Sequence, residues 1–169
     1  QDHSKHQMAG MKHGAEMSDR RLPKQGGQSA FAAIQEIVTM LEANPKTDWS
    51  KVDIEALRQH LIDMNNVTLD ATVSSASTDN SMTFIVAGEG KVIGSIQRMI
   101  TGHAATVNGF EGWTYAAKEN ATGADLMVTP PNRKEMVKLR ALSLIGVLAQ
   151  GMHHQQHHWM LANGMQPHK

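Results

Sequence analysis

The stretch that decides the fold is VTLDATVSSASTDNSMTFIVA, residues 67–87. Its two ends, Val67–Ser75 and Met82–Ala87, are rich in Thr, Val, Ile and Phe, which are residue types that favour strands. The polar residues 78–81 (TDNS) between them are typical of a turn. The stretch therefore predicts a β-hairpin.

A similar pattern returns further along the chain, with a shift of roughly 43 residues. Trp113–Lys118 and Asp125–Thr129 are predicted strands, and residues 120–123 (NATG) form the turn between them. A predicted helix follows each hairpin, over about 90–106 and about 133–162. Strand–strand–helix therefore occurs twice.

The two hairpins are expected to meet in one sheet. If the copies pair, residues 84–86 (FIV) face residues 126–128 (LMV) or their neighbours. This pairing produces a four-stranded antiparallel sheet, and the two repeat helices then cover one of its faces.

A pair of helices is predicted before the first hairpin. Residues 30–44 carry apolar side chains at helical spacing, and Pro45 ends the run. Ser50 followed by Asp53 resembles a capping box at the start of a second helix, over about 51–66. Together these segments predict a helical hairpin.

The predicted fold class is α+β: an N-terminal helical hairpin followed by a repeated strand–strand–helix unit that forms a four-stranded antiparallel sheet. Residues 30–165 make a single domain, which suits a chain of 169 residues, and residues 1–29 are a flexible Met/His-rich arm. An all-α four-helix bundle is the alternative, because the strand assignments depend on short segments.

Composition excludes several kinds of site. The chain has no Cys, so it has no thiolate zinc site, iron–sulfur cluster or thiol nucleophile. Its 16 basic and 16 acidic residues balance, which argues against a nucleic-acid partner. The longest apolar-rich run, Leu139–Ala149, falls short of a membrane span of about 20 residues. The 10 His and 12 Met offer nitrogen and thioether ligands, which suit copper.

The densest group of such ligands is MHHQQHHWM, residues 152–160. On a helix, His153 pairs with His157 and His154 with His158, because residues four apart lie on one face. Two imidazoles at this spacing can chelate one ion. Met152 adds a thioether beside them.

Two other predicted helices carry a His–Met pair at the same spacing, His60 with Met64 and Met99 with His103. If the three helices converge, these residues and one His pair of the last helix form a mixed His/Met pocket. Such a pocket suits copper, and zinc or a non-covalent haem b are the alternatives.

The arm carries ligands of the same kind, namely His3, His6 and His13 together with three Met. Its run DHSKHQMAGMKHG, residues 2–14, resembles the Met/His-rich arms of periplasmic copper-resistance proteins of bacteria. The resemblance covers residues 1–17 and implies an arm that binds copper loosely and passes it on.

Motifs for catalysis are absent from the sequence. His154-Gln155-x-x-His158 has the spacing of the HExxH zinc-protease motif, but Gln155 replaces the general-base Glu. There is no phosphate-binding glycine loop and no GxSxG elbow. The sequence therefore favours binding over catalysis.

The prediction is an exported metal-binding protein that sequesters or delivers copper, with a haem- or copper-dependent redox protein as the alternative. The first residue is Gln1, as in a chain whose signal peptide has been removed, so we expect a periplasmic or secreted location. The expected partners are the metal ion and either a second metalloprotein or a second copy of the chain.

Overall fold

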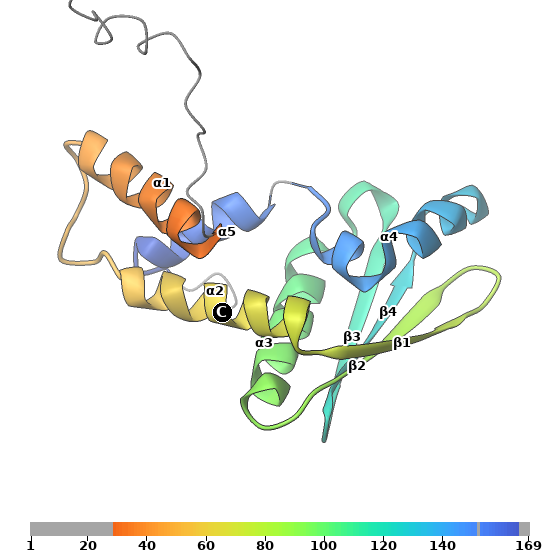
Figure 1. Ribbon diagram of the computed structural model, residues 1–169. Helices are drawn as coiled ribbons and strands as arrows, with labels where there is room; N and C mark the ends of the chain where they lie inside the picture. The colour runs from red at the N-terminus through yellow and green to blue at the C-terminus, as the bar shows by residue number, and fades with distance from the viewer. Residues whose placement is uncertain (1–28, 152, 166–169) are drawn as a thin grey trace, which may run out of the picture.

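A computed structural model of the chain describes residues 29–151 and 153–165 (Figure 1). These residues form five α-helices and four strands, with two short 3-10 turns at Phe110–Gly112 and Arg133–Glu135. In chain order the elements are α1 (Ser29–Ala43), α2 (Ile54–Leu69), β1 (Thr72–Ser77), β2 (Met82–Ala87), α3 (Lys91–Val107), β3 (Thr114–Asn120), β4 (Gly123–Thr129), α4 (Met136–Leu148) and α5 (His153–Ala162).

The four strands form one antiparallel sheet in the order β1-β2-β4-β3. Strands β2 and β4 lie at its centre, where Phe84 pairs with Leu126 and Met82 with Val128. The predicted pairing of the two hairpins is therefore confirmed, and with it the α+β class. The alternative, an all-α four-helix bundle, is wrong because the strand-forming residues pair with one another across the chain.

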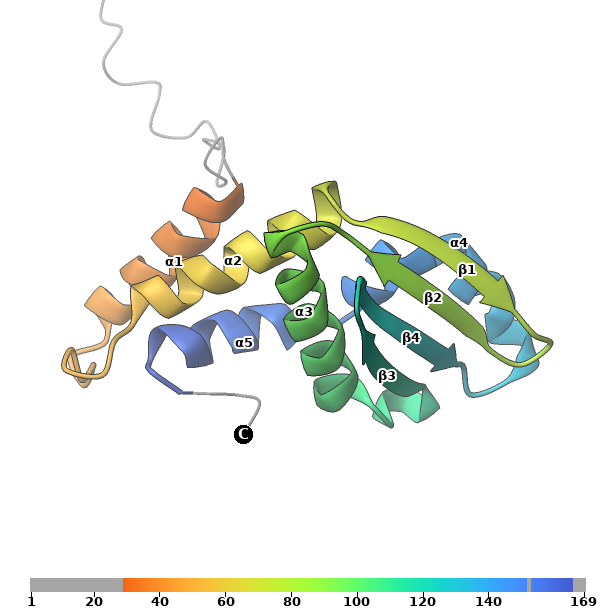
Figure 2. The same ribbon diagram turned by 90° about the horizontal axis from the view of Figure 1, so that it is seen from below.

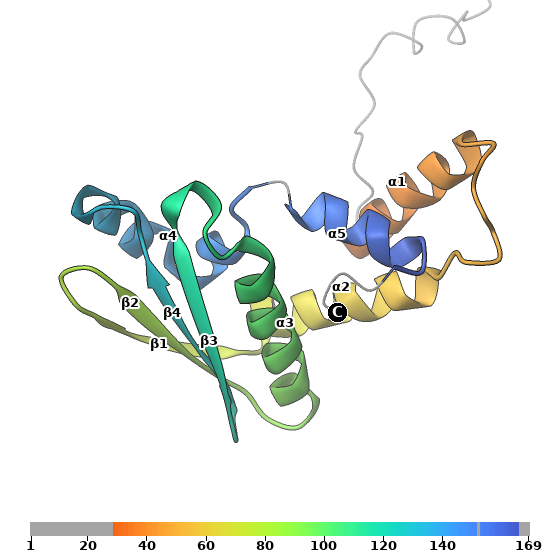
Figure 3. The same cartoon turned by 180° about the vertical axis from the view of Figure 1, so that it is seen from behind.

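One face of the sheet is buried. Alternate side chains of β2 and β4 point to that face, including Phe84, Val86 and Leu126, which are fully buried. Helices α3 and α4 supply the other side of this core, with Ile96, Ile100 and Leu139 among the buried residues. Figure 3 shows both helices on the same side of the sheet. Burial of one such side chain contributes roughly 1.5–3 kcal/mol.

A second core lies among the helices α1, α2 and α5. Its buried residues are Ile37, Leu41, Leu57 and Ala162. The N-terminal helical pair is therefore completed by α5, which lies alongside α2 in Figure 2. A backbone hydrogen bond of 2.8 Å from Asp53 N–H to the carbonyl of Ala162 links the start of α2 to the end of α5. Helix α3 connects the two cores, because it packs on both α2 and the sheet.

The last predicted helix, about 133–162, is wrong as one continuous element. Helix α4 ends at Leu148, and α5 begins at His153. Gly151 lies between them with φ +74°, a conformation that a right-handed helix cannot include. The consequence for the histidines is large, because His153 becomes the first residue of a separate helix.

The first hairpin also begins later than predicted. Val67 belongs to the last turn of α2 and is buried in the sheet core, and the strand begins at Thr72. Tertiary packing has here overridden strand propensity. Helix α2 begins after Asp53, whose carboxylate accepts from Ala56 N–H at 2.9 Å, so Asp53 is the N-cap and the predicted capping box at Ser50 is not formed.

Among the residues that the structure describes, no helix combines the length and the apolar character needed to cross a bilayer.

Gly123 lies where β4 is packed tightly against β2 and α3, so there is no room for a larger side chain. A Cβ at this position would overlap the backbone carbonyl oxygen of Val86 and lie 3.1 Å from Ile96. We expect Gly123→Ala to lower the free energy of unfolding by about 3 kcal/mol, because neither strand backbone can move away. Urea denaturation followed by circular dichroism measures the change. Gly90→Ala is the matched control: φ is +53° but the space is open, so a loss of about 1–2 kcal/mol is expected. If both variants lose the same free energy of unfolding, a steric clash at position 123 is not the cause.

Candidate functional site

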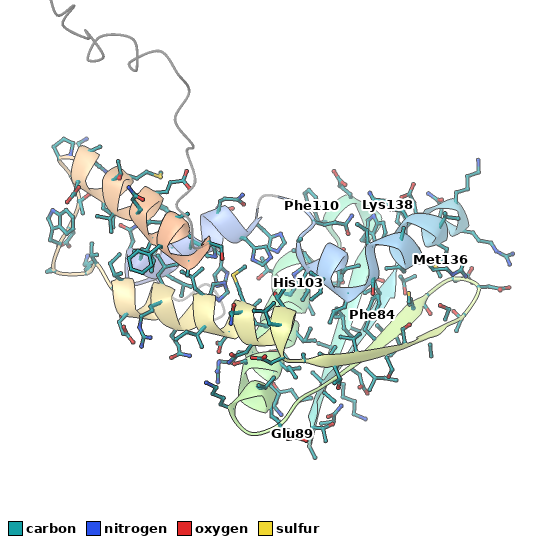
Figure 4. The ribbon with its side chains drawn as sticks, viewed as in Figure 1. Phe84, Glu89, His103, Phe110, Met136 and Lys138 are labelled. Carbon is teal, nitrogen blue, oxygen red and sulfur yellow. The ribbon has the colours of Figure 1, made fainter. Side chains whose placement is uncertain are left out.

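A cleft of about 540 Å³ lies where α2, α3 and α5 meet, between the two cores. Six of the chain's 10 histidines belong to the described residues; five of them line this cleft, and the sixth, His158, packs against His60. Figure 4 labels His103 at this junction. The six are His60 from α2, His103 from α3, and His153, His154, His157 and His158 from α5.

The break between α4 and α5 explains how one short helix reaches two neighbours. Helix α5 packs along α2, so His157 and His158 in its second turn lie against His60, with ring centroids 4.4 and 5.3 Å away. Its first residue, His153, instead lies against His103 of α3, with centroids 5.1 Å apart. The ring of His154 lies between His103 and His158, with centroids 6.5 and 6.3 Å away.

The first group of possible ligands is His60, His154 and His158, which we call the α2 position. One ring nitrogen from each of the three lies within 4.8 Å of the others. Nε2 of His158 is also 3.4 Å from the thioether sulfur of Met64. The α2 position therefore offers three imidazoles with a thioether at its edge.

The second group is His103, His153 and His154, which we call the α3 position. Its three ring nitrogens also lie within 4.8 Å of one another. The ring of Tyr115 packs edge-on against His103, with centroids 5.4 Å apart, and places this position against the sheet. The histidines of the α3 position offer nitrogen ligands, and Met99, which lines the same cleft, forms no hydrogen bond with any of the three among the described residues.

Several of these nitrogens are buried without a hydrogen-bond partner. Among the residues described, five buried side-chain polar atoms lack one, and four of them are imidazole nitrogens at this cleft. They are His60 Nε2, His153 Nε2 and both ring nitrogens of His103. A buried polar atom without a partner costs free energy of about 1–3 kcal/mol, so a cluster of such atoms marks a candidate binding site.

The first two residues of α5 each have one ring nitrogen held by the backbone. Nε2 of His154 lies 2.6 Å from the carbonyl oxygen of Leu148, so it donates that bond and Nδ1 keeps the free lone pair. His153 has a backbone hydrogen bond with Gln150 while its Nε2 stays unpaired. Imidazoles that bind metal commonly donate their second N–H to a backbone carbonyl in this way.

Four of the histidines, His60, His103, His153 and His158, have a lowered pKa, which favours their neutral form. Burial is the main cause that lowers the pKa of His60 and of His103 to about 3, and neighbouring imidazoles add to it. Asp63 opposes the shift at His60. Burial, followed by the repulsion of His154, lowers the pKa of His158 to about 4 and that of His153 below its usual value. Neutral imidazole is the form that coordinates metal.

An ion pair between buried Asp63 and the exposed side chain of Arg98 borders the cleft, and sequence reasoning missed it. Arg98 binds Asp63 through two hydrogen bonds of 2.8 Å, and Ser95 Oγ–H adds a third of 2.8 Å. Burial raises the pKa of Asp63, but these bonds outweigh it and hold the pKa below its ordinary value. The pair joins α2 to α3, so it positions His60 relative to His103. An Asp and an Arg 35 positions apart carry no sequence signal that they will meet.

The structure brings most of the predicted site residues together. The three helices converge as expected, and Met64 and Met99 lie with the histidines. The predicted pair His154–His158 falls within one group, but His153 and His157 do not share one: His153 joins the α3 position, and His157 stacks on His60 outside both groups. Met99 is buried in the sheet core and lines the cleft. Met152, His3, His6 and His13 lie outside the described residues.

Comparison with protein-family models, curated proteins and solved structures finds no match to this chain.

Proposed function

We propose that this protein binds a transition-metal ion, copper first, among the histidines of the cleft. The observation that supports this proposal is the set of four buried imidazole nitrogens without partners around one cleft. Hydrogen-bonded packing would pair these atoms, and a solvated helix end would expose them. A metal ion bound by either set of histidines would use the nitrogen lone pairs of that set, because the second nitrogen of each neutral ring carries the proton.

The choice of copper is supported by the donor set. Imidazole suits copper and zinc, whereas a thioether such as that of Met64 beside His158 favours Cu(I). The chain has no cysteine that would compete as a thiolate ligand. A haem takes one or two axial protein ligands, so haem b would leave most of these imidazoles unused. Zinc remains the second candidate ion.

The proposed role is holding and delivering the ion. Asp63 is the one carboxylate among the residues that line the cleft, and its two oxygens accept hydrogen bonds from Arg98 and Ser95. The resemblance of residues 1–17 to copper-binding arms supports an exported protein in which the arm collects copper and the cleft holds it. A second metalloprotein that receives the ion belongs to this proposal.

Thermal unfolding with and without metal tests the proposal. An ion that binds the native protein at 100 times its dissociation constant stabilises it by about 2.7 kcal/mol. We expect Cu(I), and more weakly Zn²⁺, to raise the melting temperature accordingly. The triple variant H60A/H103A/H154A should lose this shift, because it removes a ligand from each helix. A chain with His3, His6 and His13 replaced by Ala should retain it. An unchanged melting temperature with both ions would refute metal binding in the cleft.

A further inference from the structure

We propose that the cleft holds one ion at a time, in either of two overlapping positions that share His154, and that the class of the ion decides which position it occupies. Cu(I) takes the α2 position beside Met64, whereas Zn²⁺ or Cu(II) takes the α3 position. This inference rests on the proposed metal binding and adds stoichiometry and selectivity to it.

The sharing of His154 limits the cleft to one ion. His154 belongs to both three-histidine groups. Its Nε2 donates a hydrogen bond of 2.6 Å to Leu148, so the neutral ring has a single lone pair, on Nδ1. One lone pair binds one ion. A second ion would have to bind without this imidazole, and its position would then offer two histidines instead of three.

The two positions differ in the chemistry of the remaining donors. At the α2 position, His158 Nε2 and Met64 Sδ are 3.4 Å apart. Ligands at bond lengths of about 2.0 Å (nitrogen) and 2.3 Å (sulfur) around a tetrahedral ion lie about 3.5 Å apart. Nitrogen and sulfur are therefore already at the spacing of two ligands of one ion. A thioether favours the soft ion Cu(I) over Zn²⁺.

The α3 position has no such sulfur contact among the described residues. Its donors are His103, His153 and His154, and His103 is buried with both ring nitrogens unpaired. Three imidazoles with a fourth position open are a common set for Zn²⁺, and imidazole also suits Cu(II). The two positions are close together, because the ring centroid of the shared His154 lies 6.3 Å from that of His158 and 6.5 Å from that of His103. An ion therefore changes position by exchanging the partners of His154.

Stoichiometry is the first test. The full chain is used with the ligands of the arm removed, by His→Ala at positions 3, 6 and 13 and Met→Leu at positions 8, 11 and 17. We expect one equivalent of Cu(I), or one of Zn²⁺, to saturate it. When Cu(I) is added to the zinc-loaded chain, one Zn²⁺ should be released for each Cu(I) bound. A chain that holds Cu(I) and Zn²⁺ together overturns the shared site while leaving metal binding intact. Uptake of neither ion overturns both proposals.

Selectivity is the second test, with His60→Ala and His103→Ala as a matched pair. His103→Ala should weaken Zn²⁺ binding by about tenfold or more and change Cu(I) affinity by less than about threefold, and His60→Ala should do the reverse. X-ray absorption of the Cu(I)-loaded chain should show one sulfur neighbour, which is lost in Met64→Leu and kept in the control Met40→Leu on α1. Equal weakening of both ions by both histidine variants, or a Cu(I) site without sulfur, overturns the two positions.

Discussion

His154→Ala is expected to cause the largest loss of metal affinity of any single substitution in the cleft, about 100-fold or more for Cu(I) and for Zn²⁺. Outer residues that only orient a ligand already contribute 10–100-fold, so a direct ligand should reach at least the upper end of that range. His154 is the one histidine that belongs to both groups of possible ligands. Each other histidine of the two groups belongs to one group, and its loss leaves the other group complete.

His157→Ala is the matched control for this experiment. His157 lies on the same helix and stacks on His60, with ring centroids 4.4 Å apart, but it belongs to neither group. Its substitution should lower affinity by about tenfold or less, through the orientation of His60. Isothermal titration with competing chelators measures both variants. A His157 variant that loses more affinity than the His154 variant would show that the ion lies elsewhere in the cluster.

Acidification is expected to destabilise the metal-free protein by several kcal/mol. The pKa of His60 and that of His103 lie at about 3 in the folded chain, mainly because of burial, and that of His158 at about 4. An unfolded His has a pKa near 6.5. Between pH 6.5 and about 3 the unfolded chain therefore binds more protons than the native chain, and stability falls as the pH falls through this window. Each pKa unit corresponds to about 1.4 kcal/mol.

Urea denaturation at pH 7.0, 6.0, 5.0 and 4.5, followed by tryptophan fluorescence, measures this loss. Trp159 packs with the helical core beside the histidines of α5, so its emission reports the docking of that helix. The variant H60Q/H103Q removes two of the titrating groups and should flatten the pH dependence. A stability that stays constant or rises as the pH falls to 4.5 would contradict the neutral, buried state of the cluster.

The lowered pKa values of these histidines also change the pH dependence expected for metal binding. From the sequence alone, affinity should decline as the pH falls through about 6.5, since protonated imidazole does not coordinate. In the structure, His60, His103 and His158 stay neutral to a much lower pH because the cleft disfavours their charged forms. Protons therefore compete less with the ion at these residues than at an exposed histidine.

The sheet could be predicted from the sequence because its signal is local. Strand-favouring residues in Met82–Ala87 and turn residues at 78–81 define one hairpin, and the return of the pattern defines the second. The pairing of Phe84 with Leu126 followed from this repetition. The strand predicted for Val67 is wrong, because its helical state depends on packing against the sheet core and not on propensity.

The ligands of the candidate site were also visible in the sequence, as residue types at helical spacing: the MHHQQHHWM run and the two His–Met pairs. The division of these residues into two sets of neighbouring ligands was not visible in the sequence. It depends on the break at Gly151, which starts a new helix at His153 and sends adjacent histidines to different neighbours. Composition and spacing determined which possible ligand types the chain offers and at what spacing, because side-chain identity and local periodicity are properties of neighbouring residues. Only the tertiary structure decided which nitrogens are buried, unpaired and shared, because these properties arise where α2, α3 and α5 meet.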